Sequence, residues 1–334
     1  MSKYEARILT EPEFLHWDRL VERSEMGTIF HSSKWITTAA KNLNVDYVII
    51  GVFNDSQLIG GCFFYIKKIF HVFKIGYTGV PSAPFGGFVI PISPKKIKVR
   101  ESEDKEYEII SLILEKIHTF NLSMVKLTNS PLLMDIRPLT QRGWIGRVLY
   151  TYVVYLDNDI FLNMGNKTKT NIRKAQKMGI KVKKEYNPEI FWTLTKLTYD
   201  KQNINIHSLK EYLSNFMEMI IQNNLGEMWI AEMPSGEVIA AFFVLFDGDM
   251  AQGWFGSSDP QFKSTGVVSF LYFESFKDLQ NRGFHSINMM GANFPQISKF
   301  ISSFNPRLVP YYSVKKTQGI YRIIDTIQFL LARK

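Results

Sequence analysis

The sequence predicts an α+β fold in which one domain pattern occurs twice. Residues 47–61, YVIIGVFNDSQLIGG, predict a strand, an Asn-Asp turn and a second strand, because runs of β-branched and aromatic residues flank turn residues. Residues 228–246, MWIAEMPSGEVIAAFFVLF, predict the same arrangement around a Pro-Ser-Gly turn. Further β-rich sequence follows each hairpin, at 62–90 and at 250–257. Two such series of strands in one chain favour a duplicated domain.

In both halves the strands are followed by an amphipathic helix and a short apolar strand. The first helix is predicted over residues 106–120 and the second over residues 265–284, because apolar residues recur at spacings of three and four. The short strands follow at 123–129 and 286–291. Each half is therefore predicted to contain helices, a meander of about three strands, one helix and one strand, as expected of a duplicated α+β domain.

The two predicted domains span residues 1–148 and 149–334. The boundary precedes LYTYVVYLD (149–157), a strong strand pattern that we assign to the second domain as its first element. The second domain is also predicted to hold a basic helix at 166–178 and an amphipathic helix within its C-terminal stretch, GIYRIIDTIQFLLARK.

The composition is that of a folded protein with large cores. Of 334 residues, 46% are hydrophobic and 14% aromatic, and the 21% that are charged are too few for a disordered chain. The net charge of +9 predicts an anionic partner. We count 19 Lys and Arg against 15 Asp and Glu in residues 1–150, and 21 against 16 in the remainder. Because the excess is spread over both halves, as +4 and +5, we expect no nucleic-acid-binding tail and no DNA partner.

Several common kinds of site and segment are not expected. Cys62 is the only cysteine, so the chain cannot form an internal disulfide or a cysteine zinc cluster. The six histidines show no metal-binding spacing, and no metal is predicted. The sequence lacks the pattern of a signal peptide and any run of about 18 apolar residues, so we expect a cytoplasmic protein. The amphipathic C-terminal segment leaves peripheral attachment at the inner face of the membrane as an alternative.

The most basic part of the chain is residues 166–184, with eight Lys or Arg and no Asp or Glu. This segment is predicted to begin with a helix that Asn166 or Thr168 caps and that Gly179 ends in the left-handed conformation. One side of the helix is expected to pack inward through Ile172, Ala175 and Met178.

Lys169, Arg173 and Lys177 are spaced by four and share one face of this helix. A solvated basic face is one explanation of the pattern. The other is contact with a polyanion, such as a diphosphate, a tRNA backbone or an anionic lipid headgroup. In that second interpretation we select Arg173 and Lys177 as phosphate-binding residues, because several cations on one face, Arg among them, can engage a row of phosphate oxygens.

A second candidate site lies between Met289 and Val314. A strand is predicted to end at Met290, and a Gly-Ala-Asn turn that includes Asn293 precedes a helix that Pro295 starts. A turn from a strand into a helix can point backbone N–H groups at a ligand, and Asn293 is therefore a predicted substrate contact. Phe300 and Phe304, four residues apart, are expected to face the core.

Four segments resemble motifs of the FemABX-like proteins. KTKTNIRKAQKMGIKV resembles the signature (R)xNIRKAxKxGV, and GANFPQISKFISSFNPRLVPYY resembles the C-terminal block GAxxxSIxxFKxxFGxxLVPYY. FHSSKWITTAA resembles the element FQxxxW, and VPSAPFGGFVI is similar to the loop PxxxxGG. The four matches occur in family order over roughly residues 28–314, and together they are specific.

The resemblance implies two tandem GNAT-like domains, each a mixed, mostly antiparallel sheet flanked by helices. It also implies N-acyl transfer: FemABX enzymes move an amino acid from aminoacyl-tRNA to an amine of a peptidoglycan precursor. Relatives with the same tandem fold act as acetyltransferases in polysaccharide and cell-envelope synthesis. The expected donor is thus acyl-CoA or aminoacyl-tRNA, with no tightly bound cofactor. The expected acceptor is a phosphate-bearing amino-sugar or peptide precursor, and the chain resembles members without a helical arm.

One position departs from the family pattern. The lysine of FKxxFG, which supports the transition state where it is present, falls on Ile301, and the glycine falls on Asn305. Lys299 and Arg307 are close in sequence, but a helical arrangement points them elsewhere. The catalytic residues are therefore not assigned from the sequence.

The other substrate candidates come from the first half of the chain. Trp35, Tyr77 and Phe85 are aromatic residues that could contact a sugar or a base, with a core position as the alternative for each. Lys34 is predicted to bind an acceptor phosphate or carboxylate, or else to be solvated. Cys62 lies in the apolar stretch GGCFFYI and is expected in the core.

A donor site is predicted in the second half. GNAT domains that use acyl-CoA hold its pyrophosphate on a [Q/R]xxGx[G/A] loop at a helix N-terminus. KSTGVV, from Lys263 to Val268, is a degraded form of this loop, in which Lys263 and Gly266 are the predicted donor contacts. The side chain of Val268 would hinder the close backbone approach that a glycine permits.

Two alternatives to an acyltransferase stay open at this point. The first is a catalytically silent module that keeps the fold and binds an anion, and Ile301 motivates it. The second is a peripheral membrane protein that uses the amphipathic C-terminal segment.

Overall fold

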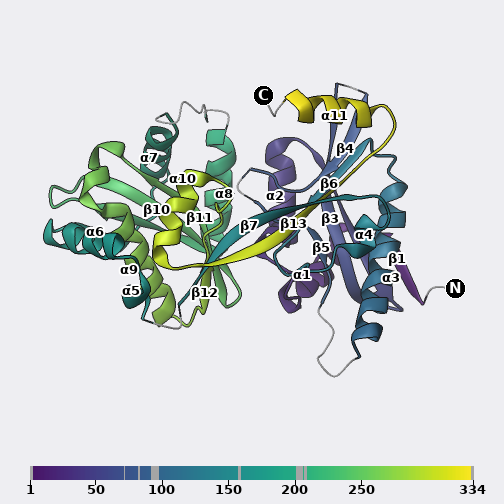
Figure 1. Cartoon of the computed structure of the whole chain (residues 1–334), viewed down its shortest axis with the longest axis horizontal. Helices are drawn as coiled ribbons and strands as arrows, with labels where there is room; N and C mark the ends of the chain where they lie inside the picture. The colour runs from purple at the N-terminus through teal and green to yellow at the C-terminus, as the bar shows by residue number, and fades with distance from the viewer. Residues whose placement is uncertain are drawn as a thin grey trace. The chain divides into compact units, whose positions relative to one another are not determined.

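The computed structural model describes residues 3–70, 72–81, 83–91, 98–156, 159–200, 206 and 209–331 (Figure 1). The chain divides into two compact units. Unit 1 consists of Met1–Leu149 together with Pro310–Lys334, and unit 2 consists of Tyr150–Val309.

Unit 1 is built on a mixed sheet. Its strands are β1 (Tyr4–Ile8), β2 (Asp46–Asn54), β3 (Gln57–Ile69), β4 (Phe73–Tyr77), β5 (Gly87–Val89), β6 (Met124–Thr128) and parts of β7 (Ile145–Tyr155) and β13 (Arg307–Thr317). The order is β1-β2-β3-β4-β6-β13, with β5 beside β3, and β4 with β6 is the parallel pair. The helices are η1 (Glu11–Glu13), α1 (Phe14–Arg23), η2 (Ile29–His31), α2 (Ser33–Leu43), α3 (Val99–His118), α4 (Arg137–Thr140) and α11 (Tyr321–Leu331).

Two consecutive glycines show how helices cover both faces of this sheet. A Cβ atom on Gly60 of β3 would lie 2.9 Å from Ile109 of α3. A Cβ atom on Gly61 would lie 2.6 Å from Trp17 of α1. Because neighbouring residues of a strand face opposite sides, α3 packs on one face and α1 on the other. Cys62 is fully buried between them, as predicted, and burial raises the pKa of its thiol.

Unit 2 has a second mixed sheet, in the order β7-β12-β11-β10-β9-β8. Its further strands are β8 (Lys181–Lys184), β9 (Gly226–Glu232), β10 (Val238–Asp247), β11 (Met250–Ser258) and β12 (Ser286–Asn288), and β11 with β12 is the parallel pair. The helices are α5 (Ile160–Asn163), α6 (Asn166–Lys177), α7 (Pro188–Asp200), α8 (Lys210–Gln222), η4 (Pro260–Thr265), α9 (Val267–Asn281), α10 (Pro295–Ile301) and η5 (Ser302–Phe304).

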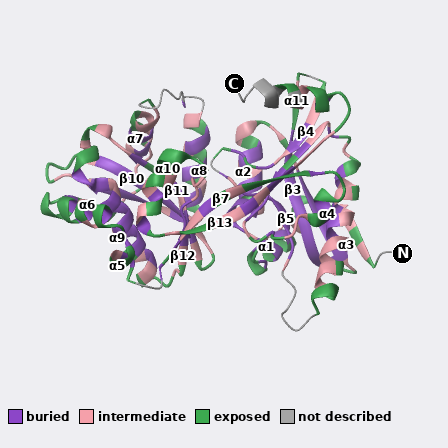
Figure 2. Cartoon of the chain, in the orientation of Figure 1, coloured by how far each residue is buried: buried purple, intermediate pink, exposed green. Residues whose placement is uncertain are grey.

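The core of unit 2 is aromatic on both faces of its sheet. Phe242 of β10 stacks on Tyr272 of α9 with ring centroids 4.1 Å apart. The next residue, Phe243, meets Phe191 of α7 edge-on at 6.1 Å. The sheet therefore lies between α9 and α7, and Figure 2 shows β3 and β10, the central strands of the two units, as buried.

The predicted duplication is confirmed. In unit 1 the meander β2-β3-β4 is followed by α3 and by β6, which pairs parallel to β4. In unit 2 the meander β9-β10-β11 is followed by α9 and by β12, which pairs parallel to β11. The hairpin turns and the two short strands occur where the sequence predicted them. The two amphipathic helices overlap their predicted ranges, but α3 begins at Val99, seven residues before the predicted start at 106.

The C-terminal segment differs from the prediction. The sequence analysis assigned all of 149–334 to the second domain, whereas residues 310–334 pack in unit 1. The cause is the pairing of β13 with β6, in which Ser313 lies opposite Thr128 and their hydroxyls are 3.1 Å apart. A strand pairing over 185 positions leaves no signal in local sequence patterns. Among the helices in the described part of the chain, none is long and apolar enough to cross a membrane.

Candidate functional site

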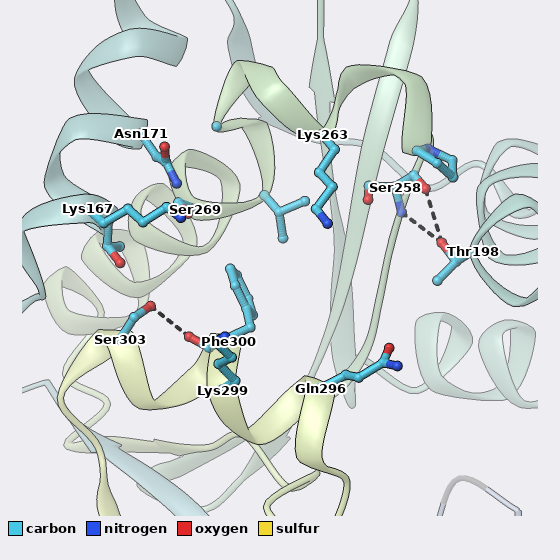
Figure 3. A pocket seen from close by; sticks show the side chains of 14 residues that line it. Lys167, Asn171, Thr198, Ser258, Lys263, Ser269, Gln296, Lys299, Phe300 and Ser303 are labelled. Atoms are coloured by element: carbon cyan, nitrogen blue, oxygen red, sulfur yellow. Dashed lines mark hydrogen bonds between the residues drawn. The ribbon is translucent and has the colours of Figure 1, made fainter. Parts of the chain in front are cut away.

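Unit 2 contains a cavity of about 860 Å³ next to the start of α9 (Figure 3). It lies where segments far apart in the sequence meet: the first turns of α6, the end of α7, η4, the first turn of α9, and α10. Its lining residues are Lys167, Thr168, Asn171, Thr198, Ser258, Pro260, Lys263, Gly266, Val268, Ser269, Gln296, Lys299, Phe300 and Ser303. Among the described residues, the lining contains lysines, hydroxyls and amides and no Asp or Glu.

Three lysines from three different elements line this cavity. Lys167 comes from α6, Lys263 from η4 and Lys299 from α10. Figure 3 shows Lys167 and Lys263 reaching into the space from different sides. Within the described residues, no carboxylate forms an ion pair with any of the three. Convergent ammonium groups without a counter-charge favour a ligand with several negative charges, such as a phosphate or diphosphate.

Two buried hydroxyls face the same space. Thr168 is 3% exposed and Ser269 is 4% exposed, and both line the cavity. In the part of the chain that the structure describes, neither hydroxyl has a hydrogen-bond partner, whereas Ser303 Oγ donates to the Phe300 carbonyl at 2.7 Å. A hydroxyl that lines a cavity and has no partner in the described protein can donate a hydrogen bond to a ligand there or accept one from it.

The first turn of α9 completes the site. Gly266 precedes this helix with φ +82°, and a Cβ atom there would lie 2.3 Å from the Asn171 carbonyl oxygen of α6. The first N–H groups of a helix have no carbonyl partner within the helix and carry partial positive charge. Thr265 Oγ1 accepts from Val267 N at 3.2 Å, and the following residues, Val268 and Ser269, line the cavity. Glycine here thus lets α6 and α9 meet closely enough to form one anion-binding corner.

The predicted basic row on α6 does not reach the cavity. Arg173 lies over the Phe161 ring, 5.3 Å from its centroid, and Lys169 Nζ donates to the Leu162 carbonyl at 2.7 Å. Neither Arg173 nor Lys177 lines the cavity, and both are exposed. The cation of α6 that lines it is Lys167, because the Lys167–Asn171 side of the helix faces α9.

The helix itself follows the prediction in extent and in Gly179, whose φ is +71°. Its cap was predicted wrongly. The N-cap residue is Gly165 and not Asn166 or Thr168, and no side chain caps the helix. Ile172 and Ala175 are buried as predicted, whereas Met178 is 36% exposed because it lies past the last turn.

On α10 Lys299 and Ile301 face different sides of the helix, as the sequence predicted. Ile301, at the family lysine position, is 3% exposed and belongs to the core of unit 2. Residues two apart on an α-helix point about 200° apart, so a core-facing Ile301 turns Lys299 away from the core. The side away from the core is the cavity side, and Lys299 lines the cavity. The sequence predicted that Lys299 faces a different side from the family lysine position, and the structure adds that this side lines the cavity.

Asn293 has a structural role instead of lining the cavity. Its Oδ1 accepts from Tyr150 N at 3.0 Å, and its Nδ2 donates to the Tyr150 carbonyl at 2.9 Å. These two bonds attach the turn after β12 to β7, which explains why an amide is suited to this position. Phe300 lines the cavity, and Phe304 is buried in the core as predicted.

In unit 1 two of the aromatic candidates are core residues. Trp35 is fully buried and meets Phe30 edge-on at 4.9 Å, and Phe85 is 2% exposed and meets Phe30 at 6.1 Å. Neither ring offers a surface to a substrate, which corrects the prediction. Tyr77 is half-buried, and desolvation raises the pKa of its phenol. Lys34 is exposed on α2.

His31 is buried beside these rings. Its Nδ1 lies 2.8 Å from Thr28 Oγ1, and its ring meets Phe63 edge-on at 5.5 Å. Desolvation lowers the pKa of His31 to about 4. The imidazole is therefore neutral at pH 7 and packs as part of the core. In the described part of the chain, no group of three His, Cys, Asp or Glu side chains could hold a metal ion.

This burial predicts a pH dependence of stability. Because the pKa of His31 is lower in the folded state than the ordinary 6.5, its contribution is complete above pH 6.5 and is lost as the pH falls towards 4. The free energy of unfolding should fall by about 2 kcal/mol between pH 6.5 and 5 on this account alone. When the free energy of unfolding is measured in urea at several pH values, the variant His31→Gln should lack the decrease that His31 causes between pH 6.5 and 5. The explanation is wrong if the variant keeps the wild-type slope.

Comparison with known proteins agrees with this architecture. Residues 166–295 match a family model described as an acetyltransferase (GNAT) domain, a range that runs from α6 to the first residue of α10. The crystal structure of FemX aligns with a TM-score of 0.76 and 12% identity, over 96% of this chain and 99% of FemX. The chain has a FemX-like tandem GNAT fold.

Other structures with this tandem GNAT fold are more distant. L-PGS from Bacillus licheniformis aligns with a TM-score of 0.57 and 13% identity, over 98% of this chain and 99% of that protein. A tandem GNAT protein from the clavulanic acid biosynthesis pathway aligns with a TM-score of 0.54 and 9% identity, over 95% and 99%. Among curated proteins, none matches the sequence. The predicted fold class is confirmed, and the likenesses concern the arrangement of the backbone.

Proposed function

We propose that this chain is an N-acyltransferase that moves an acyl or aminoacyl group onto an amine of a cell-envelope precursor, an amino sugar or a peptide. The GNAT-type acyltransferase fold supports the reaction class. The observation that carries the proposal is the cavity of unit 2, which Lys167, Lys263 and Lys299 line and whose described lining contains no carboxylate. Acyl donors and envelope precursors of this kind carry phosphate groups, which such a cavity can bind.

The chemistry needs few protein groups. The neutral amine of the acceptor attacks the carbonyl carbon of the donor and forms the C–N bond. The C–S bond of a thioester or the C–O bond of an ester breaks, and the leaving thiol or ribose hydroxyl takes up the proton that the amine loses. The protein has to hold both substrates and stabilise the oxyanion that develops on the carbonyl. No protein nucleophile is needed, in agreement with the complete burial of Cys62.

We assign roles to the three lysines by their neighbours. Lys167 and Lys263 lie on the side of the cavity formed by α6 and η4, near the first turn of α9, and would bind donor phosphates. Lys299 comes from α10, as the family lysine does, and would stabilise the oxyanion. Val268 lines the cavity where many GNAT domains have a small residue, and this feature is compatible with either acyl-CoA or aminoacyl-tRNA.

A role at the cell envelope rests on the motif resemblance and on two structural neighbours. FemX is one, and the other is the C-terminal domain of a putative lysylphosphatidylglycerol synthetase from Agrobacterium fabrum. The name of the second protein refers to the synthesis of lysylphosphatidylglycerol, which is an aminoacylated phospholipid. We place the protein in the cytoplasm, where aminoacyl-tRNA, acyl-CoA and nucleotide-linked precursors occur, with contact to the inner face of the membrane.

The direct test is an acyl-transfer assay with the purified chain. Labelled acetyl-CoA and labelled aminoacyl-tRNA are supplied in turn with amino-sugar and peptidyl precursors, and the product is separated and counted. We expect sustained turnover with one donor class. A chain that accelerates transfer from neither donor would instead be the catalytically silent anion-binding module, and sustained turnover would exclude that alternative.

The assigned phosphate contacts predict a change in affinity that depends on salt. Lys263→Ala should weaken binding of the accepted phosphate-bearing ligand by about tenfold at low ionic strength, because one charge-assisted contact is lost. The difference from wild type should shrink as salt rises, since partly exposed ionic contacts are screened. Titration calorimetry at two salt concentrations measures both values. Lys177→Ala is the matched control on the exposed side of α6, and an equal loss in both variants would refute the assignment.

A further inference from the structure

Unit 1 carries an apolar surface that its fold leaves exposed. We call it the docking surface, and it combines the turn between β3 and β4 with α11 and the residue that precedes this helix. Its members are Phe70, 72% exposed, Val72, 78%, Ile320, 66%, Ile323, 62%, and Ile327, 51%. Single exposed apolar residues are ordinary, but a group of five bulky ones in one place indicates an interaction site.

Ring and backbone contacts bring the two segments together. Phe73, at the start of β4, and Tyr321, at the start of α11, have ring centroids 5.2 Å apart. Ser123 N donates to the Lys74 carbonyl at 2.8 Å, and Gln318 N donates to the Ser123 carbonyl at 2.9 Å. The β3–β4 turn and α11 therefore share one end of the sheet of unit 1, and Figure 1 shows α11 beside β4.

The isoleucines form a stripe that folding does not use. Ile320, Ile323 and Ile327 have the spacing of one helical face. α11 packs through another side, where Tyr321 is 6% exposed and Asp325 accepts from Lys315 Nζ at 2.6 Å. The contacts that attach the helix thus leave this stripe of three isoleucines exposed to solvent.

The turn between β3 and β4 shows the same feature. Phe70 has φ +50°, a left-handed conformation that is unfavourable for a bulky residue. Its ring is mostly exposed, so the position contributes little burial to the fold. An exposed phenylalanine and valine at a hairpin turn, beside an exposed helical stripe, are suited to insert together into an apolar phase.

Positive charge predominates in the two segments that carry the apolar group. Segments 67–74 and 315–327 contain six Lys or Arg, namely Lys67, Lys68, Lys74, Lys315, Lys316 and Arg322, and one acid, Asp325, which gives +5. Exposed isoleucine and phenylalanine in segments rich in Lys and Arg match the boundary of an anionic bilayer, where apolar groups enter and cations meet headgroups. A second copy of this surface would instead bring like charges together.

We propose that the docking surface binds the anionic phospholipid surface of a membrane. The binding is peripheral: the five apolar side chains enter the headgroup boundary and the cations of the two segments contact lipid phosphates. This inference goes beyond the proposed acyl transfer and does not depend on it, because it concerns residues of unit 1 and a readout without turnover.

The test is co-sedimentation of the full chain with lipid vesicles. Vesicles of phosphatidylglycerol and phosphatidylcholine should bind the wild type at low salt, and phosphatidylcholine alone should bind it more weakly. The double variant Ile323→Ser with Ile327→Ser should bind anionic vesicles about tenfold less tightly, since two apolar side chains no longer enter the boundary. Leu15→Ser with Val99→Ser, at exposed positions of α1 and α3, is the matched control and should bind like the wild type.

Thermal unfolding checks that both double variants are folded, as expected for exposed positions. The proposal is overturned if wild type and the Ile323/Ile327 variant sediment equally with anionic vesicles. It is also overturned if vesicles do not bind and the same isoleucines instead support a dimer seen by analytical ultracentrifugation, because the occupant would then be a second copy. If substitution of the α6 lysines alone abolishes vesicle binding, the contact with the membrane lies on another surface, and the proposal is refuted as well.

Discussion

Lys299→Ala should lower kcat for acyl transfer by about 10²- to 10³-fold and change KM little, the cost usually found when one donor to a developing oxyanion is removed. The reason is position. Lys299 lines the cavity of unit 2 and has no carboxylate partner in the described structure, whereas Ile301, at the family lysine position, is buried in the core. A cation that acts mainly on the transition state should affect the rate constant more than ground-state binding. Steady-state kinetics with the donor that the enzyme accepts measure both constants.

A matched control separates this effect from a general loss of charge. Lys177→Ala removes a lysine from the same unit at an exposed position that does not line the cavity, and it should leave both constants near their wild-type values. If Lys299→Ala raises KM and leaves kcat unchanged, Lys299 binds substrate and does not stabilise the oxyanion. If both variants behave like the wild type, the cavity is not the reaction site.

Gly266→Ala should destabilise unit 2 by roughly 3 kcal/mol and abolish ligand binding in the cavity. Two costs combine at this position. The backbone has φ +82°, which a side chain rarely adopts, and a Cβ atom would lie 2.3 Å from the carbonyl oxygen of Asn171. Since that oxygen belongs to the backbone of α6, relief requires α6 and α9 to separate, which would open the corner that Thr168 and Ser269 line. Chemical unfolding and ligand titration of the folded fraction measure the two effects.

Gly236→Ala provides the control for backbone conformation alone. Gly236 has φ +86° in the turn between β9 and β10, and a Cβ atom added there would have no described atom within 4 Å. This variant should lose about 1 kcal/mol and keep full ligand affinity. Equal losses of stability in the two variants would show that contact with Asn171 adds nothing, and intact ligand binding in Gly266→Ala would remove the α6–α9 corner from the site.

Much of the fold could be predicted because its signals are local. The hairpins at 47–61 and 228–246, the helices after them and the left-handed Gly179 each depend on residues within one element. The extent of α6 also followed from its own sequence, although its N-cap residue did not. In contrast, the pairing of β13 with β6 and the return of residues 310–334 to unit 1 depend on partners far away in sequence.

The candidate site was harder to predict for the same reason. Periodicity correctly separated the core side of α6, with Ile172 and Ala175, from its polar sides. It could not tell which polar side faces α9, so Arg173 and Lys177 were chosen where the structure brings Lys167 to the cavity. The sequence of a motif likewise does not show whether its aromatic residue is buried, as Trp35 is, or exposed to a substrate.

The most direct test of the central claim is a thermal-shift comparison of the wild type with a Lys167→Ala, Lys263→Ala, Lys299→Ala triple variant. Each sample is melted with acetyl-CoA, with a nucleotide-linked sugar-peptide precursor and with total tRNA. A ligand that binds the folded state raises Tm by mass action. We predict that at least one ligand raises the Tm of the wild type and that the triple variant, folded and with the same Tm without ligand, shows no such rise. The same rise in both proteins, or no rise with any of the three ligands, would contradict the assignment of this cavity as the substrate site.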